Sequence, residues 1–239
     1  MTESSIPTTA YTSVLVIGAS RGLGEAIVQT YVDRGAQVVG TVRSERPTAL
    51  HELAARADGA VAIEHVDIDD PAQIDALAER LSGRRFDLLF VVAGISLAPM
   101  EQIAADIPTA DFERMMLTNA LGVIRTVERL QELVAPDGTI AVMSSGQGSI
   151  TDNTTAGFEV YRATKSALNQ LMRSYAVRHA DDGRTLLLMA PGWVKTELGG
   201  PHAMLEIGES IPPLVDTVEA QRGKPGLHYL DRHGATIPW

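Results

Sequence analysis

The stretch Ser13-Val14-Leu15-Val16-Ile17-Gly18-Ala19-Ser20-Arg21-Gly22-Leu23-Gly24 decides the fold of this chain. Its short apolar run predicts a buried strand, and the three glycines that follow predict a tight turn leading into a helix. Glycines let the backbone turn sharply, approach a pyrophosphate and present amide donors at a helix N-terminus, whose dipole favours anions. Gly35 is expected to cap the end of that helix. The stretch therefore predicts the first unit of a nucleotide-binding α/β fold.

Short runs rich in Val, Ile and Leu alternate with segments of helical periodicity along the rest of the chain. This alternation is typical of βαβ units and of a parallel sheet buried on both faces. We expect one domain over residues 1–239, a single Rossmann-type doubly wound parallel sheet of about seven strands with helices on both faces. The expected strands are 13–17, 37–42, 61–65, 88–92, 139–143, 185–189 and 227–229; residues 1–11 are expected to form a tail, and 111–133 and 161–178 two long helices.

The composition argues against several classes of protein. Thirty acidic and twenty basic residues give a net charge of −10, which opposes binding to a nucleic-acid backbone. There is no cysteine, so disulfides and thiolate chemistry are excluded. The six histidines lack metal-ligand spacing, and we expect no catalytic metal. The polar N-terminus and the lack of a long apolar run predict a cytoplasmic protein without a membrane partner.

The run Tyr161-Arg162-Ala163-Thr164-Lys165 carries the strongest chemical signal. A tyrosine and a lysine at positions i and i+4 lie on the same face of a helix. A free phenol has a pKa of about 10, too high for easy proton exchange near neutral pH. A neighbouring ammonium favours the ionised phenol, so we expect Lys165 to lower the pKa of Tyr161.

The glycine turn, Ser145, the Tyr161 to Lys165 spacing and Pro191-Gly192 together resemble the short-chain dehydrogenase/reductase family over almost the whole chain. The resemblance implies that Tyr161 donates a proton to the substrate or accepts one from it, and that Lys165 lowers the pKa of Tyr161. It also implies that Ser145 binds the carbonyl oxygen of the substrate and that Asn119 holds a water that relays protons. Ser144 and Ser149 remain alternatives to Ser145. Further motifs resemble the C-factor-like subgroup: Ser144-Ser145-Gly146-Gln147-Gly148-Ser149-Ile150, Asp152-Asn153, Tyr161-Arg162, Pro191-Gly192-Trp193-Val194-Lys195-Thr196 and Ile237-Pro238-Trp239.

The same resemblance implies a dinucleotide cofactor and assigns its contacts. Val42 stands where an acidic residue would select NADH, whereas Arg43 and Arg21 stand at positions associated with the 2′-phosphate. We therefore expect NADPH rather than NADH, although Glu45 lies close in the sequence. Asp67 is expected to contact the adenine. The expected cofactor-binding residues are Gly18, Ser20, Arg21, Gly22, Leu23, Gly24, Arg43, Asp67, Ile68, Ala93, Gly94, Tyr161, Lys165, Pro191, Gly192, Trp193, Val194 and Thr196.

Two departures from the family pattern occur on neighbouring strands. Ile17 replaces a common threonine, and Val91-Val92-Ala93-Gly94 replaces Asn-Asn-Ala-Gly. Replacing both sides of a buried polar contact by apolar groups can be nearly neutral. Our hypothesis is a compensated apolar swap, which Val92→Asn would test.

The implied activity is an NADPH-dependent oxidoreductase acting on a small ketone, aldehyde or secondary alcohol. We expect the segment before Tyr161 to form a loop over the substrate and residues 196–222, rich in Gly and Pro, to form a lid. No G-x-S-x-G elbow is present, which argues against a serine hydrolase. An alternative is a dinucleotide-binding signalling protein of C-factor type. Association through the two long helices would give a homodimer or homotetramer.

Overall fold

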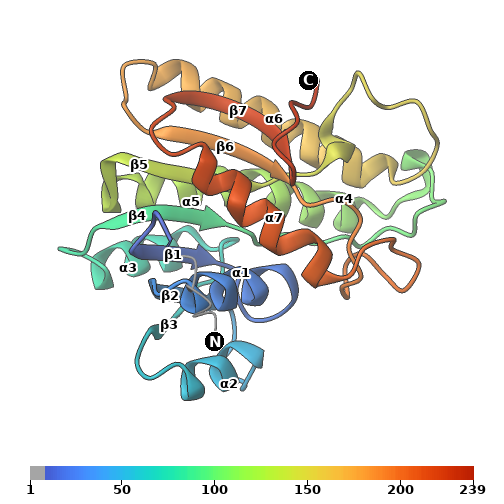
Figure 1. Ribbon diagram of the computed structural model, residues 1–239. Helices are drawn as coiled ribbons and strands as arrows, with labels where there is room; N and C mark the ends of the chain where they lie inside the picture. The colour runs from blue at the N-terminus through green and yellow to red at the C-terminus, as the bar shows by residue number, and fades with distance from the viewer. Residues whose placement is uncertain (1–8) are drawn as a thin grey trace, which may run out of the picture.

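A seven-stranded parallel sheet forms the centre of the computed structural model, which describes residues 9–239 (Figure 1). The strand order is β3-β2-β1-β4-β5-β6-β7, and every neighbouring pair is parallel. This confirms the expected Rossmann-type sheet. The strands are β1 (Ser13–Ile17), β2 (Gln37–Val42), β3 (Val61–His65), β4 (Phe86–Val91), β5 (Val134–Met143), β6 (Thr185–Ala190) and β7 (Gly226–Asp231).

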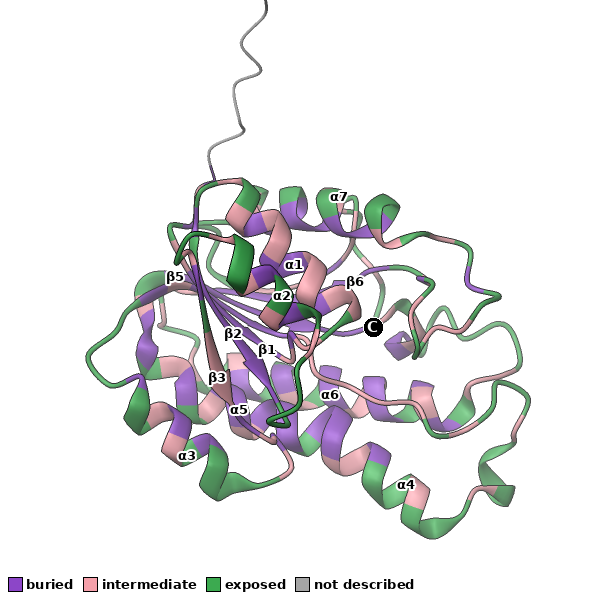
Figure 2. Ribbon diagram, turned by 90° about the horizontal axis from the view of Figure 1, so that it is seen from below, coloured by how far each residue is buried: buried purple, intermediate pink, exposed green. Residues whose placement is uncertain are grey.

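Helices cover both faces of the sheet (Figure 2). One face carries α1 (Gly22–Asp33), α2 (Ala49–Arg56) and α7 (Ile207–Ala220), whose apolar residues share one core cluster with the sheet. The other face carries α3 (Pro71–Arg80), α5 (Val123–Leu130) and α6 (Glu159–Arg178) around a second cluster, with α4 (Thr109–Met116) beside α6. None of the helices in the described part is long and apolar enough to cross a membrane.

The carboxyl ends of the central strands meet at one edge of the sheet. The chain order reverses between β1 and β4, and ligands of such sheets bind at this switch point. Gly18, Gly94, Ser145 and Pro191 follow β1, β4, β5 and β6 at this edge. Gly35 has φ +89° directly after α1, so the expected cap is confirmed.

The long helix expected over 111–133 is interrupted between α4 and α5. Residues Leu117–Gly122 form a π-helical turn, a feature that often occurs at functional sites. Close packing surrounds Gly122, because a Cβ there would lie 2.8 Å from the carbonyl oxygen of Ile68. Asn119 therefore lies in the π-helical turn rather than in a regular α-helix.

The prediction of a lid over residues 196–222 is wrong for residues 207–220. Ile207–Ala220 form α7, and Ile211, Leu214, Val215 and Val218 are buried at helical spacing against the sheet. Pro212 and Pro213 lie in its first turns, and a capping box of Glu206 and Glu209 closes its start. The prolines and glycines favoured a loop, although the apolar period was present in the sequence. Residues 196–206 and the turn at 221–222 remain outside α7.

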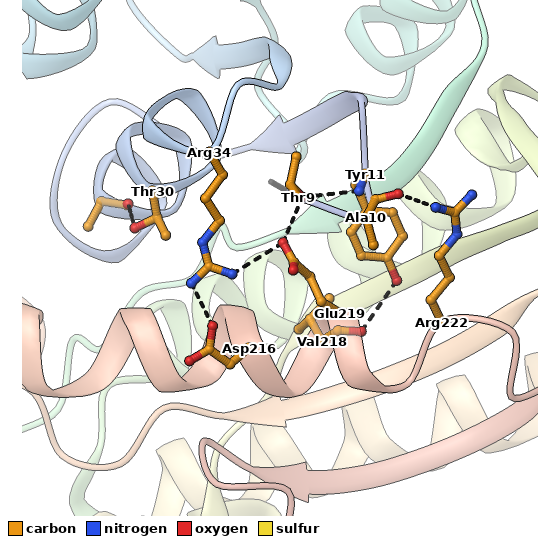
Figure 3. Close-up of polar contacts among 10 residues, drawn as sticks. Thr9, Ala10, Tyr11, Thr30, Arg34, Asp216, Val218, Glu219 and Arg222 are labelled. Atoms are coloured by element: carbon orange, nitrogen blue, oxygen red, sulfur yellow. Dashed lines mark hydrogen bonds and ion pairs between the residues drawn. The ribbon is translucent and has the colours of Figure 1, made fainter. Parts of the chain in front are cut away.

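The chain enters the sheet through a packed segment rather than a free tail. Thr9 and Tyr11 are buried, and residues 1–8 of the expected tail lie outside the described residues. Glu219 of α7 accepts a hydrogen bond from Thr9 at 2.6 Å and lies 3.3 Å from Arg34, which also pairs with Asp216 (Figure 3). The Tyr11 hydroxyl reaches the carbonyl oxygen of Val218 at 3.3 Å. These contacts connect the start of the chain, the end of α1 and α7.

Candidate active site

The glycine turn is packed so closely that two of its positions tolerate only glycine. A Cβ on Gly24 would lie 2.1 Å from the Gly18 carbonyl oxygen, and a Cβ on Gly18 would lie 2.8 Å from the Ala93 nitrogen. Gly18 also has φ +89°. Thr41 of β2, which the sequence did not single out, accepts from the Gly18 nitrogen through its hydroxyl at 3.0 Å. The ends of β1, β2 and β4 and the start of α1 are thereby held together.

The start of α1 provides the donors that a pyrophosphate requires. Arg21 occupies the N-cap position without a side-chain cap, and its guanidinium lies 2.9 Å from Glu197 on an exposed ion pair. Gly22 has φ +61°, and the nearest side-chain atom to an added Cβ would belong to Thr196 at 3.7 Å. Ser20 is partly exposed, and Leu23 packs against the core. Uncapped amide groups and an open glycine fit an anionic cofactor group.

The end of β2 carries the residues expected to choose between cofactors. Val42 is buried, whereas Arg43 is exposed. The Glu45 carboxylate lies 3.6 Å from the His65 ring nitrogen. Within residues 9–239, Arg43 forms no ion pair. Its guanidinium is available for a further anionic partner.

Asp67 and Ile68 follow β3 at the same edge of the sheet. The Asp67 carboxylate accepts from the Asp69 nitrogen at 3.1 Å, and the Asp67 nitrogen donates to Gln73 at 2.9 Å. The Ile68 side chain is buried in the core. The carboxylate thus stabilises a local turn, and its contact with adenine stays a prediction.

The hypothesis of a compensated apolar swap chose Val92 for its test, but the structure pairs Ile17 with Val91. Ile17 is paired with Val91 across β1 and β4, and both side chains lie in the same core cluster. Val92 packs against the opposite cluster, so it does not contact Ile17 through its side chain. The backbone nitrogens of Val92 and Ala93 both donate to the Ile17 carbonyl. A compensated swap at this place would join Ile17 to Val91, and Val92→Asn does not test it.

Tyr161, Ser145 and Lys165 lie together where α6 passes the end of β5. The Ser145 side chain lies near enough to the Tyr161 hydroxyl to lower the pKa of that phenol against the rise that burial causes. The Lys165 Nζ lies 5.7 Å from the centre of the Tyr161 ring and donates to the Met143 carbonyl at 2.9 Å. Lys165 is buried, with 3% of its surface exposed. Residues 9–239 contain no group of three or more His, Cys, Asp or Glu side chains that could hold a metal ion.

Burial changes the acidity of this pair in a direction that the sequence did not predict. Desolvation raises the pKa of Tyr161 to about 12, and the nearby Ser145 side chain opposes that rise. Desolvation also lowers the pKa of Lys165 to about 8. The expected lowering of the Tyr161 pKa is therefore wrong for the protein by itself, because loss of water around the hydroxyl dominates.

The three candidate serines occupy different environments. Ser144 is buried and donates to Asn169 at 2.6 Å, and Ser149 is buried and accepts from the Asp152 nitrogen at 3.0 Å. Ser145 is partly exposed, accepts from the Gln147 nitrogen and lies near the Tyr161 hydroxyl. Of the three, Ser145 has the geometry of a substrate-binding hydroxyl.

Asn119 connects the loop after β4 to α6. It is fully buried; its Oδ1 accepts from the Ile95 nitrogen at 2.8 Å, and its Nδ2 donates to the Ile95 carbonyl and to Thr164. A Cβ on Gly94 would lie 3.4 Å from Asn119 Oδ1 and 3.6 Å from Lys165 Nζ. The three residues therefore meet beside the candidate site, and the water relay stays a prediction.

The segment after β6 closes the site from the other side. Gly192 has φ +85°, and a Cβ there would lie 2.7 Å from Leu205. Trp193 donates from its indole nitrogen to the Gly199 carbonyl at 2.8 Å, and Val194 is buried. Thr196 accepts from the Gly199 nitrogen at 3.0 Å. These bonds fold residues 192–206 back toward the glycine turn.

Besides Thr41, three further supporting residues were missed because nothing in their local sequence distinguishes them. Tyr229 of β7 donates to the Ser145 carbonyl. Asn169 accepts from Ser144 and donates to the Gly148 carbonyl. Ser210 of α7 donates to the Pro191 carbonyl at 2.7 Å, which connects α7 to the turn after β6.

Comparisons with known proteins agree with this geometry. The family model for short chain dehydrogenases matches residues 12–203. A Burkholderia multivorans protein described as a short-chain dehydrogenase/reductase and solved with bound NADP is 52% identical, with a TM-score of 0.94, covering 96% of this chain and 100% of the other. A Pseudomonas aeruginosa carbonyl reductase in complex with NADP is 35% identical, with a TM-score of 0.87 and coverage of 96% and 100%. The C-signal protein of Myxococcus xanthus is 30% identical over 64% of this chain and 92% of its own length.

The packing of the glycine turn predicts that Gly24→Ala will unfold the site. A methyl group 2.1 Å from the Gly18 carbonyl must push α1 away from β1, and overpacking of this kind costs about 1–3 kcal/mol or more. Thermal unfolding and NADPH titration should show a lower Tm and weaker binding. Gly146→Ala is the control, since nothing lies within 4 Å of its added Cβ. Equal behaviour of the two variants would contradict the packing argument.

Proposed function

The chain belongs to the short-chain dehydrogenase family, and on this premise we propose that it is an NADPH-dependent oxidoreductase of small ketones, aldehydes or secondary alcohols. The observation that carries the proposal is that the Tyr161 hydroxyl, the Ser145 side chain and the buried amine of Lys165 lie together at the end of β5. A hydroxyl pair of this kind can bind a carbonyl oxygen and deliver a proton to it.

The cofactor proposal rests on the fit of this chain's own residues. The uncapped start of α1 suits the pyrophosphate, and Arg43 and Arg21 suit the 2′-phosphate. Solved proteins that are 52% and 35% identical to this chain contain NADP. When bound, NADPH supplies the hydride. The other cofactor positions expected from the sequence, at the ends of β4 and β6, lie along the same edge of the sheet.

The protein residues divide the remaining chemistry between them. With a pKa of about 12, the Tyr161 hydroxyl keeps its proton at neutral pH, as a proton donor to a carbonyl must. Ser145 holds the carbonyl oxygen beside that hydroxyl, and Tyr229 fixes the Ser145 backbone through its carbonyl. Lys165 is proposed to hold the nicotinamide ribose and to favour the ionised phenol after proton transfer. The reverse sequence serves alcohol oxidation.

A signalling role of C-factor type is the second candidate, and the likeness to the C-signal protein favours it. The oxidoreductase and the signalling protein are distinguished by whether the protein turns over a substrate. Purified protein is mixed with NADPH or NADH and a panel of ketones, aldehydes and diketones while absorbance is followed. Steady turnover supports the enzyme; tight cofactor binding without turnover supports the signalling protein.

We also propose a homodimer or homotetramer built on α5 and α6. Leu121, in the π-helical turn before α5, is 40% exposed, and Val177 on α6 is 69% exposed. Apolar side chains of this kind on neighbouring helices suit a self-complementary interface.

Tyr161→Phe should lose nearly all turnover while the protein folds and binds NADPH, because only the proton-donating hydroxyl is removed. General acid catalysis contributes roughly a hundred- to ten-thousandfold, which sets the expected loss in kcat. Tyr175→Phe is the matched control on the same helix, since its hydroxyl bonds Gln131 instead. Steady-state kinetics on a responsive ketone measure both variants. Retention of substantial turnover by Tyr161→Phe would remove the assignment.

The pKa of Lys165 predicts a pH limit on cofactor capture. Because burial lowers this pKa to about 8, the amine is charged below that pH and neutral above it. The kcat/KM for NADPH, which reports groups of the free enzyme, should be level below about pH 8 and fall above it. In Lys165→Arg the charge persists and the fall near pH 8 should disappear. Tyr161 stays protonated throughout, so a fall unchanged in the arginine variant would contradict the role of Lys165.

Arg43 should decide the preference between cofactors. An arginine bonded to a charged group contributes about 1.5–3 kcal/mol, so Arg43→Ala should weaken NADPH binding roughly ten- to a hundredfold and leave NADH little changed. Val42→Asp should reverse the preference, because a carboxylate repels the 2′-phosphate and accepts from the ribose of NADH. Arg46→Ala, exposed on the same loop, is the control. The ratio of kcat/KM for the two cofactors measures the effect; a ratio unaffected by either change would make Arg43 an ordinary surface residue.

A further inference from the structure

Phe158 is held in a backbone conformation that a phenylalanine rarely adopts. Its φ of 57° and ψ of 26° lie in the left-handed region, and the preceding Gly157 also has a positive φ of 98°. Among residues 9–239, Asp58 is the one other non-glycine with positive φ, and aspartate tolerates this region better than a bulky side chain does. Strain of this kind persists only where surrounding contacts impose it, and it is concentrated at ligand sites.

Contacts from three loops impose this conformation. The Phe158 nitrogen donates to the Met100 carbonyl at 2.7 Å, and Met100 also packs over Gly157. The buried Arg162 donates to the Gly157 carbonyl at 2.8 Å and to Thr155 at 3.1 Å. The loops after β4 and β5 are thereby fixed to each other at the start of α6.

The Phe158 ring completes the connection to the third loop. It packs edge-on against Trp193, with ring centres 6.1 Å apart and planes at 79°. Trp193 follows Pro191-Gly192 and is held by its bond to the Gly199 carbonyl. Phe158 is the N-cap residue of α6 and precedes Tyr161 by three residues in the chain. Both Phe158 and Trp193 remain partly exposed.

The same three loops carry apolar side chains that face solvent. Their exposures are large for apolar residues, and the loops all follow the carboxyl ends of strands at the site edge. These side chains are Leu97, Met100, Ile150, Leu198 and Met204, with exposures of 45%, 48%, 75%, 46% and 77%. Asp152 is the one charged residue between Ser145 and Phe158.

We propose that Phe158 determines substrate specificity: its ring, set against Trp193, forms the wall that receives an aryl or bulky apolar group of an uncharged carbonyl compound held at Tyr161 and Ser145. The inference rests on the proposed function for its reaction, but not for the apolar binding site itself. It explains why a strained phenylalanine, rather than glycine or asparagine, stands at this turn.

The test removes the ring and keeps the backbone. Phe158→Asn retains a residue that tolerates the left-handed conformation, and Phe158→Tyr retains the ring. For acetophenone, kcat/KM of the asparagine variant should fall roughly ten- to a hundredfold, mainly through KM, because ring packing and apolar burial are lost. For butanone, kcat/KM should change little, and NADPH affinity and Tm should persist. The tyrosine variant should behave as wild type with both ketones.

A binding measurement separates this inference from the proposed activity. Saturation-transfer NMR of acetophenone with the protein and NADP+ should show binding in wild type and in Tyr161→Phe, and lose it in Phe158→Asn. Binding with this dependence but no turnover would overturn the oxidoreductase and leave the specificity site standing. Turnover with equal loss for both ketones would make Phe158 a positioning residue for Tyr161 and overturn the proposal. Unchanged kinetics and binding in Phe158→Asn would overturn it as well.

Discussion

The close approach of α1 to the end of β1 is the constraint from which the geometry of the site follows. The Gly24 backbone lies against the Gly18 carbonyl with no room for a methyl group, and a Cβ on Gly18 would lie 2.8 Å from the Ala93 nitrogen after β4. Because the Ala93 nitrogen is also held by the Ile17 carbonyl, the chain has little freedom before Gly94. Gly94 then lies beside Asn119 and Lys165. Backbone contacts therefore join the glycine turn directly to Asn119 and Lys165, which are proposed to take part in proton transfer.

Burying the Lys165 amine costs stability that the rest of the fold must offset. A pKa lowered from 10.5 to about 8 corresponds to roughly 3 kcal/mol against the charged form. One hydrogen bond to the Met143 carbonyl compensates part of that cost. The Tyr161 hydroxyl is disfavoured as an anion by the same burial. The charged amine is thus held in energetically unfavourable surroundings, a common property of residues at functional sites.

Periodicity predicted the sheet well because each parallel strand is a compact apolar run, and all seven expected strands are present. The fold of residues 207–220 was not predicted, since Pro212 and Pro213 concealed the helical spacing of Ile211, Leu214, Val215 and Val218. Motifs brought Tyr161, Lys165 and Ser145 to one place correctly. The partner of Ile17 was missed because strand register, which pairs it with Val91, is a tertiary property. Tyr229 and Asn169 were missed because their roles depend on contacts between distant segments.

Arg162 shows how the loop before Tyr161 is given a defined shape. Its guanidinium is buried at 8% exposure, and within residues 9–239 it has no carboxylate partner, so its burial is costly. Its donors instead satisfy the Gly157 carbonyl and Thr155, groups of a loop that would otherwise be free to move. A flexible loop would require neither the burial of a guanidinium group nor a phenylalanine with positive φ. Both occur within four residues of Tyr161, and a loop restricted by such contacts loses less conformational entropy when a substrate binds.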